Sequence, residues 1–144
     1  MAIIMAPRSD RHLLEHGTRL ALKFDDRGLV PVVTTCGDSG KLLMQAWANI
    51  DAVEATLTSG EAHYFSRSRS ELWHKGATSG EIQKILEVRT DCDQDSLWYI
   101  VHQLGGGCCH TGHDSCFYRV AAKEGPNKDG SWRLEPAVDA TRQK

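Results

Sequence analysis

Three aspartates stand at alternate positions in the short segment "DCDQD", namely Asp91, Asp93 and Asp95. Carboxylate oxygens are the ligands that Mg²⁺ and Mn²⁺ prefer, and three close carboxylates repel one another unless a cation lies between them. In a straight strand Asp91 and Asp95 would lie about 13 Å apart, with Cys92 on the opposite face, too far for one ion to touch all three aspartates. Either the segment bends, or only two aspartates share a metal. A solvated acidic turn is the alternative, and an EF-hand loop is excluded because its glycine and glutamate positions hold Ser96 and His102.

The chain has five cysteines: Cys36, Cys92, Cys108, Cys109 and Cys116. An odd number, with no recognisable export signal, argues for metal binding or catalysis rather than disulfides, and the isolated Cys36 is expected to be a small buried residue. No C-x-x-C pair is present, which excludes zinc fingers, ribbons and knuckles. Three thiolates and a water would form a catalytic zinc site, in which the metal lowers the pKa of the water and supplies hydroxide. A fourth ligand, from Cys108 or a histidine, would instead make the site structural, and spacing alone leaves both alternatives, and the absence of a metal, open.

His110 and His113 lie in the loop between Cys109 and Cys116. Because His110 directly follows Cys109, binding of one ion by both side chains would be awkward. We therefore expect His110 to act beside the metal as an acid or base.

A locally basic, hydroxyl-rich segment runs from position 63 to position 76 of this slightly acidic chain. Its polar and cationic side chains are Ser66, Arg67, Ser68, Arg69, Ser70 and Lys75. Guanidinium forks and hydroxyls on neighbouring strands suit phosphate, and Trp73 or Tyr64 can stack on a base. The loop "GATSG" that follows offers backbone N–H groups to an anion, although many plain turns look the same. The alternatives are a solvated cationic hairpin and, for the two aromatic residues, a place in the core.

The elements that must position these residues are mainly strands. Alternating and β-branched runs predict strands within residues 28–37, 41–48, 61–69, 70–76, 79–90 and 96–105, the first two forming a hairpin. A short helix is expected over residues 11–16, ended by Gly17. Residues 49–60 predict the one clear helix, capped by Asn49 or Asp51 and ended by Gly60. The sum is a β-rich α+β domain, with a glycine-rich loop before Arg119.

Composition sets the broad class of protein. With 144 residues, 40% of them hydrophobic and 25% charged, the chain predicts one soluble domain over residues 21–123, an N-terminal extension over 1–20 and a polar tail over 124–144. The net charge of −2 gives no overall attraction to nucleic acid or membrane. No apolar run reaches the roughly 20 residues that span a bilayer, and "MAIIMAPRSD" does not resemble a secretory signal. We therefore expect a cytoplasmic protein with neither nucleic acid nor membrane as a partner.

Zinc, a second divalent cation and a phosphate-binding surface together point to hydrolysis of a phosphorylated small molecule. A nucleobase deaminase is the alternative enzyme, but its H-x-E and P-C-x-x-C signature is absent. A structural-zinc module that binds RNA is the alternative of another class. The small number of basic residues and the net acidic charge argue against it.

Three blocks of the chain, "GEAHYFSRSRSELWHKGATSGEIQKI", "RTDCDQDSLWYIVHQ" and "CHTGHDSCFYR", resemble successive signatures of the phosphoribosyl-AMP cyclohydrolase family, and "GLVPVV" and "GKLLMQAWAN" resemble its first hairpin. The resemblance runs from about Leu29 to Arg119. It implies a mixed or antiparallel twisted sheet in an intertwined homodimer. It also implies a hydrolase that acts on a carbon–nitrogen bond of a cyclic amidine. That enzyme opens the adenine ring of N1-(5-phosphoribosyl)-AMP at the N1–C6 bond in histidine biosynthesis, giving the formimino aminoimidazole carboxamide ribotide.

The resemblance also implies the ligands of two metals. Zinc would be bound by Cys92, Cys109 and Cys116, drawn from both subunits, and magnesium by the three aspartates 91, 93 and 95. Zinc hydroxide would attack C6 while His110 moves protons. The phosphorylated substrate would be held by Ser66, Arg67, Ser68, Arg69, Trp73 and Lys75. Cys108 departs from the pattern, since a small apolar residue usually precedes the cysteine of C-H-T-G.

Overall fold

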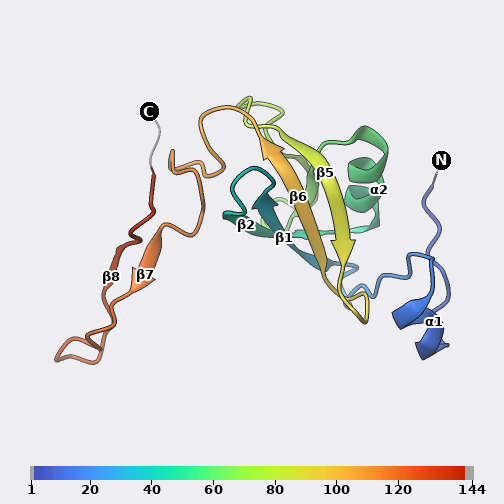
Figure 1. The fold of residues 1–144 in the computed structure, drawn as a ribbon, viewed down its shortest axis with the longest axis horizontal. Coiled ribbons are helices and arrows are strands. Elements are labelled where there is room, and N and C mark those ends of the chain that lie inside the picture. The colour runs from blue at the N-terminus through green and yellow to red at the C-terminus, as the bar shows by residue number, and fades with distance from the viewer. Residues whose placement is uncertain (1, 142–144) are drawn as a thin grey trace.

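A four-stranded mixed sheet in the order β2–β1–β6–β5 forms the centre of the molecule (Figure 1). The structure is a computed structural model and describes residues 2–141. β1 (Val30–Cys36) and β2 (Leu42–Ala48) form the predicted antiparallel hairpin. β1 also pairs in parallel with β6 (Leu97–Gln103), which pairs antiparallel with β5 (Gln83–Thr90). The fold is therefore α+β with a mixed sheet, as the sequence predicts.

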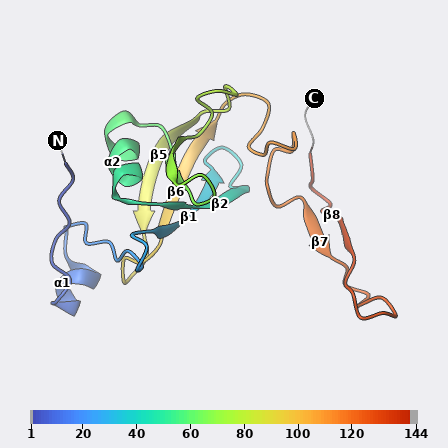
Figure 2. The same ribbon diagram turned by 180° about the vertical axis from the view of Figure 1, so that it is seen from behind.

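One helix packs against this sheet. α2 (Ile50–Ser59) begins at Asn49, whose side chain accepts a hydrogen bond from the Ala52 N–H, and ends at Gly60 in the left-handed region with φ +74°. Both ends lie where the sequence predicts them, and Asn49 rather than Asp51 is the cap. The helix buries Ala52, Val53 and Thr56, and it contacts β2 and the hairpin that follows it (Figures 1 and 2).

That second hairpin carries the basic segment. β3 (His63–Ser66) pairs antiparallel with β4 (Glu71–His74), so that Ser66 lies opposite Glu71 and residues 67–70 form the turn. Tyr64 of β3 is fully buried, whereas the turn is exposed. The hairpin therefore anchors one face in the core and presents its tip to solvent.

The two ends of the described chain lie on opposite sides of the sheet (Figure 2). α1 (Arg11–His16) is the predicted short helix, capped by Asp10 and ended at Gly17. The last strands, β7 (Arg119–Ala121) at the end of the predicted domain and β8 (Leu134–Pro136) in the predicted polar tail, pair as an exposed hairpin. No helix within residues 2–141 has the length and apolar character to cross a membrane.

Candidate active site

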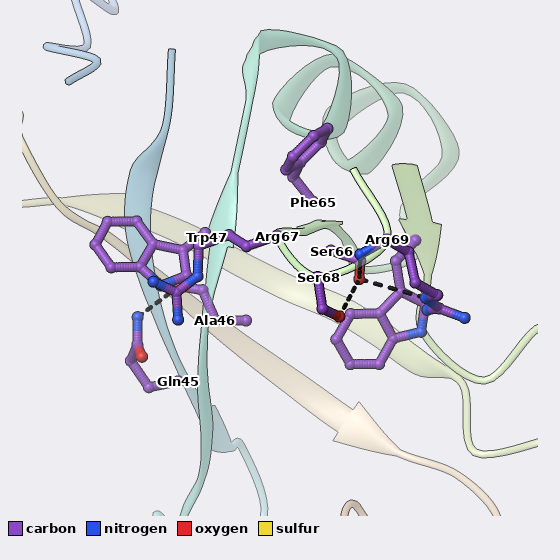
Figure 3. A pocket seen from close by; sticks show the side chains of 9 residues that line it. Gln45, Ala46, Trp47, Phe65, Ser66, Arg67, Ser68 and Arg69 are labelled. Carbon is purple, nitrogen blue, oxygen red and sulfur yellow. Dashed lines mark hydrogen bonds between the residues drawn. The ribbon is translucent and has the colours of Figure 1, made fainter. Parts of the chain in front are cut away.

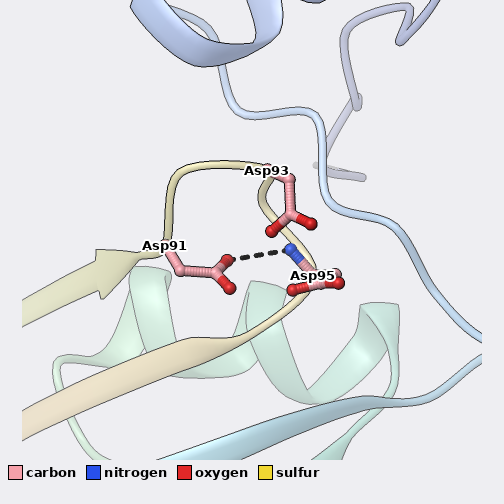
Figure 4. A group of neighbouring side chains, drawn as sticks. All are labelled: Asp91, Asp93 and Asp95. Carbon is pink, nitrogen blue, oxygen red and sulfur yellow. Dashed lines mark hydrogen bonds between the residues drawn. The ribbon is translucent and has the colours of Figure 1, made fainter.

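The segment from Asp91 to Asp95 is a tight turn between β5 and β6, not a strand (Figure 4). One carboxylate oxygen from each of Asp91, Asp93 and Asp95 lies within 4.8 Å of the others. Asp91 Oδ1 accepts hydrogen bonds from the N–H groups of Asp95 at 3.0 Å and Ser96 at 3.1 Å, which closes the turn. The segment therefore bends, which was one of the two alternatives that the sequence allowed. The strand alternation that placed Cys92 opposite the aspartates is wrong, because a turn replaces the pleat.

Crowding in the acidic turn shifts the pKa values of Asp91 and Asp95 in opposite directions. Hydrogen bonds to Asp91 and then Asp93, with some burial and the repulsion between like charges, raise the pKa of Asp95 to about 6. Burial acts to raise the pKa of Asp91, but hydrogen bonds from Asp95 and the backbone N–H groups of the turn outweigh it and lower that pKa. Three hard oxygen ligands this close together fit a divalent cation such as Mg²⁺, whose charge would relieve the repulsion between them.

The thiols form a separate cluster in the cysteine loop, which we define as residues 105–118. The thiols of Cys108, Cys109 and Cys116 lie near one another, with Cys108 and Cys109 buried and Cys116 exposed, whereas Cys92 is exposed in the acidic turn. The hydrogen bond to Cys108 and burial raise the pKa of Cys116. The same hydrogen bond, outweighing burial and helped by nearby Lys75, lowers the pKa of Cys108. Among the described residues, the three aspartates are the only group of three or more potential ligands close enough for one ion, so one chain does not bring Cys92, Cys109 and Cys116 together at one ion.

Side chains within the cysteine loop hold Cys109 in place. Cys109 is almost completely buried, and its Sγ accepts a hydrogen bond from the Thr111 hydroxyl at 3.1 Å. Thr111 Oγ1 also hydrogen-bonds His113 Nδ1 at 2.8 Å, and His113 stacks on Tyr118 with 3.7 Å between ring centroids. His113 therefore supports the loop, while His110 is exposed. Only the T-x-H spacing in the sequence hints at this support.

A buried polar network lies beneath the cysteine loop, and sequence reasoning missed it. Lys75 Nζ donates to the Cys108 carbonyl at 2.6 Å and lies 3.9 Å from Glu81 Oε2. Gln83 Nε2 donates to Cys108 Sγ at 3.7 Å, and Gln83 Oε1 accepts from the Tyr64 hydroxyl at 2.5 Å. Tyr64 thus belongs to the core rather than to a stacking surface. The sequence carried no clear signal for this network, because Gln83 is the first residue of a strand with several other polar residues.

The predicted phosphate-binding residues line one hollow of about 470 Å³ (Figure 3). Its predicted members are Ser66, Arg67, Ser68, Arg69 and Trp73. Trp47 of β2 also lines it, and the Arg67 guanidinium lies 5.0 Å from the centroid of the Trp47 ring. Ser66 Oγ accepts from the N–H and Nε of Arg69, both at 3.3 Å, which orients that guanidinium. Trp47 was not predicted to line this hollow.

Two further hollows adjoin this one through shared side chains. Arg69 and Trp73 also line a hollow of about 400 Å³ that contains Lys75 and His110. Trp47 also lines a hollow of about 290 Å³ that contains Asp95. The acidic turn, the basic hairpin and His110 are thus connected along one surface of one chain.

The mixed sheet, the acidic turn and the basic hollows define a class of protein: a small α+β protein with a candidate metal-dependent active site for an anionic molecule. Comparison with known proteins narrows that class. A sequence model of the phosphoribosyl-AMP cyclohydrolase family matches residues 44–118. This chain belongs to that family, so it is an enzyme of the hydrolase class.

Curated relatives support the assignment over most of the chain. A phosphoribosyl-AMP cyclohydrolase of Rhodopseudomonas palustris (strain BisB18) is 51% identical over 129 residues, which cover 90% of this chain and 85% of the relative. The protein of the same name from strain BisA53 is 55% identical over the same proportions. The one from Brucella anthropi is 47% identical over 140 residues, or 96% of this chain and 98% of the relative.

Proposed function

We propose that this chain hydrolyses the N1–C6 bond of N1-(5-phosphoribosyl)-AMP and so opens the adenine ring in histidine biosynthesis. The observation that carries the proposal is the row of three adjoining hollows, which joins Asp95, the Arg67–Arg69 hairpin and His110 in a member of this family. A nucleotide with two phosphates presents anionic groups at both ends and a planar base between them. Such a molecule matches the basic and aromatic walls of the two larger hollows, whereas the third hollow carries the acidic side chains of Asp25 and Asp95.

The hairpin tip supplies the groups suited to the phosphates. Arg67 and Arg69 carry planar forks that pair with phosphate oxygens, and Ser66 and Ser68 offer hydroxyl donors beside them. Trp73 lies between the two larger hollows, where its ring can stack on the base. Lys75 lines the second hollow, but its ammonium is buried and donates to the Cys108 carbonyl, so its positive charge acts from beneath the site.

The two predicted metals have different support in the residues present. The convergence of Asp91, Asp93 and Asp95 supports magnesium at the acidic turn. For zinc, Cys109 and Cys116 lie near each other in one chain, and both Cys116 and Cys92 are exposed. A homodimer in which Cys92 reaches the thiols of the other subunit would complete a three-thiolate set. When bound there, zinc lowers the pKa of a water molecule and supplies hydroxide near neutral pH.

The exposed imidazole of His110 is placed to move protons. The ribosyl group on N1 makes the adenine ring cationic, so C6 is electrophilic and accepts the oxygen of water. The N1–C6 bond then breaks, one proton of the water goes to N1, and loss of the other from the C6 oxygen leaves the carbonyl of a carboxamide and neutralises the charge that the ring carried. His110 lines the same hollow as Arg69 and Trp73, so it can accept the proton from the attacking water and return it to N1.

A turnover assay with metal analysis of the same sample tests this proposal. Purified protein should open the ring of N1-(5-phosphoribosyl)-AMP and contain zinc. Cys109→Ser should lose both zinc and turnover, whereas Cys36→Ser, which replaces a thiol outside the cysteine loop, should keep both. Release of ammonia from an adenine nucleotide without ring opening would overturn the proposal in favour of deamination. Full turnover in Cys109→Ser would remove zinc-activated water from the mechanism.

A further inference from the structure

The acidic turn is fastened from outside by the segment that precedes β1, which we call the N-terminal strap (residues 6–23). Gln94, between two of the aspartates, is only 6% exposed although its neighbours are exposed. Its Oε1 accepts from the Ala21 N–H at 2.8 Å, and its Nε2 donates to the carbonyls of Leu14 at 3.0 Å and Arg19 at 3.4 Å. Every polar atom of this side chain is therefore bonded to the strap.

The backbone of the turn is held by the same segment. The guanidinium of Arg8 donates to the carbonyl oxygens of Asp93 at 2.8 Å and Gln94 at 3.4 Å, and it also donates to the Ala21 carbonyl. The N–H of Lys23 donates to the Gln94 carbonyl at 2.8 Å. Two successive carbonyls of the turn thus have partners in the strap, and these hydrogen bonds join positions that are more than 70 residues apart in the sequence.

The turn needs this support because its backbone is strained. Gln94 has φ +55°, in the left-handed region that favours glycine, and a non-glycine residue stays there only when its surroundings hold it. Since Gln94 lies between Asp93 and Asp95, its conformation sets the direction in which both of these carboxylates point.

We propose that Gln94 and Arg8 are positioning residues for this enzyme, and that the N-terminal strap holds the acidic turn in the shape that binds a divalent cation. The inference rests on the proposed function in one respect, namely that a cation binds at Asp91, Asp93 and Asp95. It extends that function by making the N-terminal segment part of the metal site.

Substitution of Arg8 distinguishes the positioning role from a purely electrostatic effect on cation binding. A positive charge beside three carboxylates opposes cation binding, so a purely electrostatic effect predicts that Arg8→Ala tightens binding. The positioning role predicts the opposite sign, because the carbonyls of Asp93 and Gln94 lose their guanidinium partner. Arg11 offers a matched control, since it is an exposed arginine of the same strap whose side chain pairs with Glu15.

The experiment is a Mn²⁺ titration of the full-length protein, with free Mn²⁺ measured by electron paramagnetic resonance. The variant Asp93→Asn identifies the signal of this site. Gln94→Gly removes the side chain while tolerating positive φ, so it isolates the bonds to the strap from backbone strain. We expect Gln94→Gly and Arg8→Ala to raise the Mn²⁺ dissociation constant by about tenfold or more, the usual effect of removing a residue that orients metal ligands, and Arg11→Ala to leave it unchanged.

Amide hydrogen exchange of the metal-free protein supplies the second measurement. The N–H groups of Asp95 and Ser96, which donate to Asp91, should exchange faster in Gln94→Gly than in the wild type. Unchanged exchange, or unchanged Mn²⁺ affinity in Gln94→Gly, would overturn the inference, as would tighter binding by Arg8→Ala. Failure of the wild-type protein to bind Mn²⁺ would instead overturn the magnesium site of the proposed function.

Discussion

The substitution Tyr64→Phe tests whether the buried network beneath the cysteine loop stabilises the fold. The Tyr64 hydroxyl lies 2.7 Å from Thr34 Oγ1 and donates to Gln83 Oε1 at 2.5 Å. Gln83 in turn donates to Gln103 Oε1 at 2.9 Å and to Cys108 Sγ. The hydroxyl therefore links the central strand β1 to the residue that precedes Cys109.

The expected loss of stability arises because two buried polar groups lose their hydrogen-bond partner. Phenylalanine keeps the ring packing, but the buried Gln83 carbonyl oxygen loses its donor and the Thr34 hydroxyl loses its partner. A buried polar group left without a partner costs about 1–3 kcal/mol. We expect the free energy of unfolding to fall by about 2–4 kcal/mol, which for 144 residues lowers Tm by roughly 7–13 °C.

Tyr99→Phe is the matched control. The Tyr99 hydroxyl is also buried, but its bonds to Thr56 Oγ1 and the His63 carbonyl are longer, at 3.3 and 3.4 Å. Thr56 Oγ1 keeps shorter hydrogen bonds with the Ala52 carbonyl and the His63 N–H, at 2.8 and 2.9 Å. Because these partners stay satisfied, the control should lose less than about 1 kcal/mol.

The assay is urea unfolding of both variants and the wild type, followed by circular dichroism. Protomer concentration and metal content are held constant, because bound metal and subunit association both add to apparent stability. If Tyr64→Phe lost no more stability than Tyr99→Phe, the network would not support the fold and the reasoning would be refuted.

Two other outcomes follow from local geometry. Burial lowers the pKa of His63, helped by the nearby His74 ring, so below about pH 6.5 the unfolded chain binds a proton at this residue before the folded chain does. Stability should therefore fall as pH drops from 7.5 to 5.5, and thermal unfolding of His63→Gln should show a weaker dependence; an unchanged slope would contradict this. Gly76 has φ +84°, and a Cβ there would lie 2.2 Å from the backbone of residues 81–82, whereas Gly80 has φ +82° and open space around it. Gly80→Ala should lower the free energy of unfolding by about 1 kcal/mol because of its backbone conformation alone, and Gly76→Ala by about 1–3 kcal/mol more, both measured by urea unfolding. Equal losses of stability would show that the loop moves to make room for the added methyl group.

Local signals account for most of the elements that the sequence predicts correctly. Asn49 can cap a helix and Gly60 can adopt positive φ, and both depend only on neighbouring residues. The strands of the two hairpins follow from alternation of apolar and polar residues, which is also a short-range property. These features are readable because the forces that set them act within a few residues.

Other parts of the site depend on contacts between distant segments. The sequence left open whether residues 91–95 bend, because the turn is held by Asp91 from within and by the N-terminal strap from outside. The burial of Lys75 against the Cys108 carbonyl reverses the exposure expected of a lysine in a basic hairpin. Likewise Trp47 reaches the hollow because β2 lies beside the β3–β4 hairpin.

The amino-acid sequence alone was enough to predict the family, the α+β class and the residue types of each cluster, because motif identity and hydrophobic periodicity are written in short stretches of chain. The tertiary structure was needed to show that the three carboxylates converge, that Cys109 and Cys116 meet while Cys92 lies apart, and that three hollows share walls. These arrangements arise from side-chain packing and hydrogen bonds between residues that are far apart in the sequence. Patterns within short stretches of chain therefore cannot predict them.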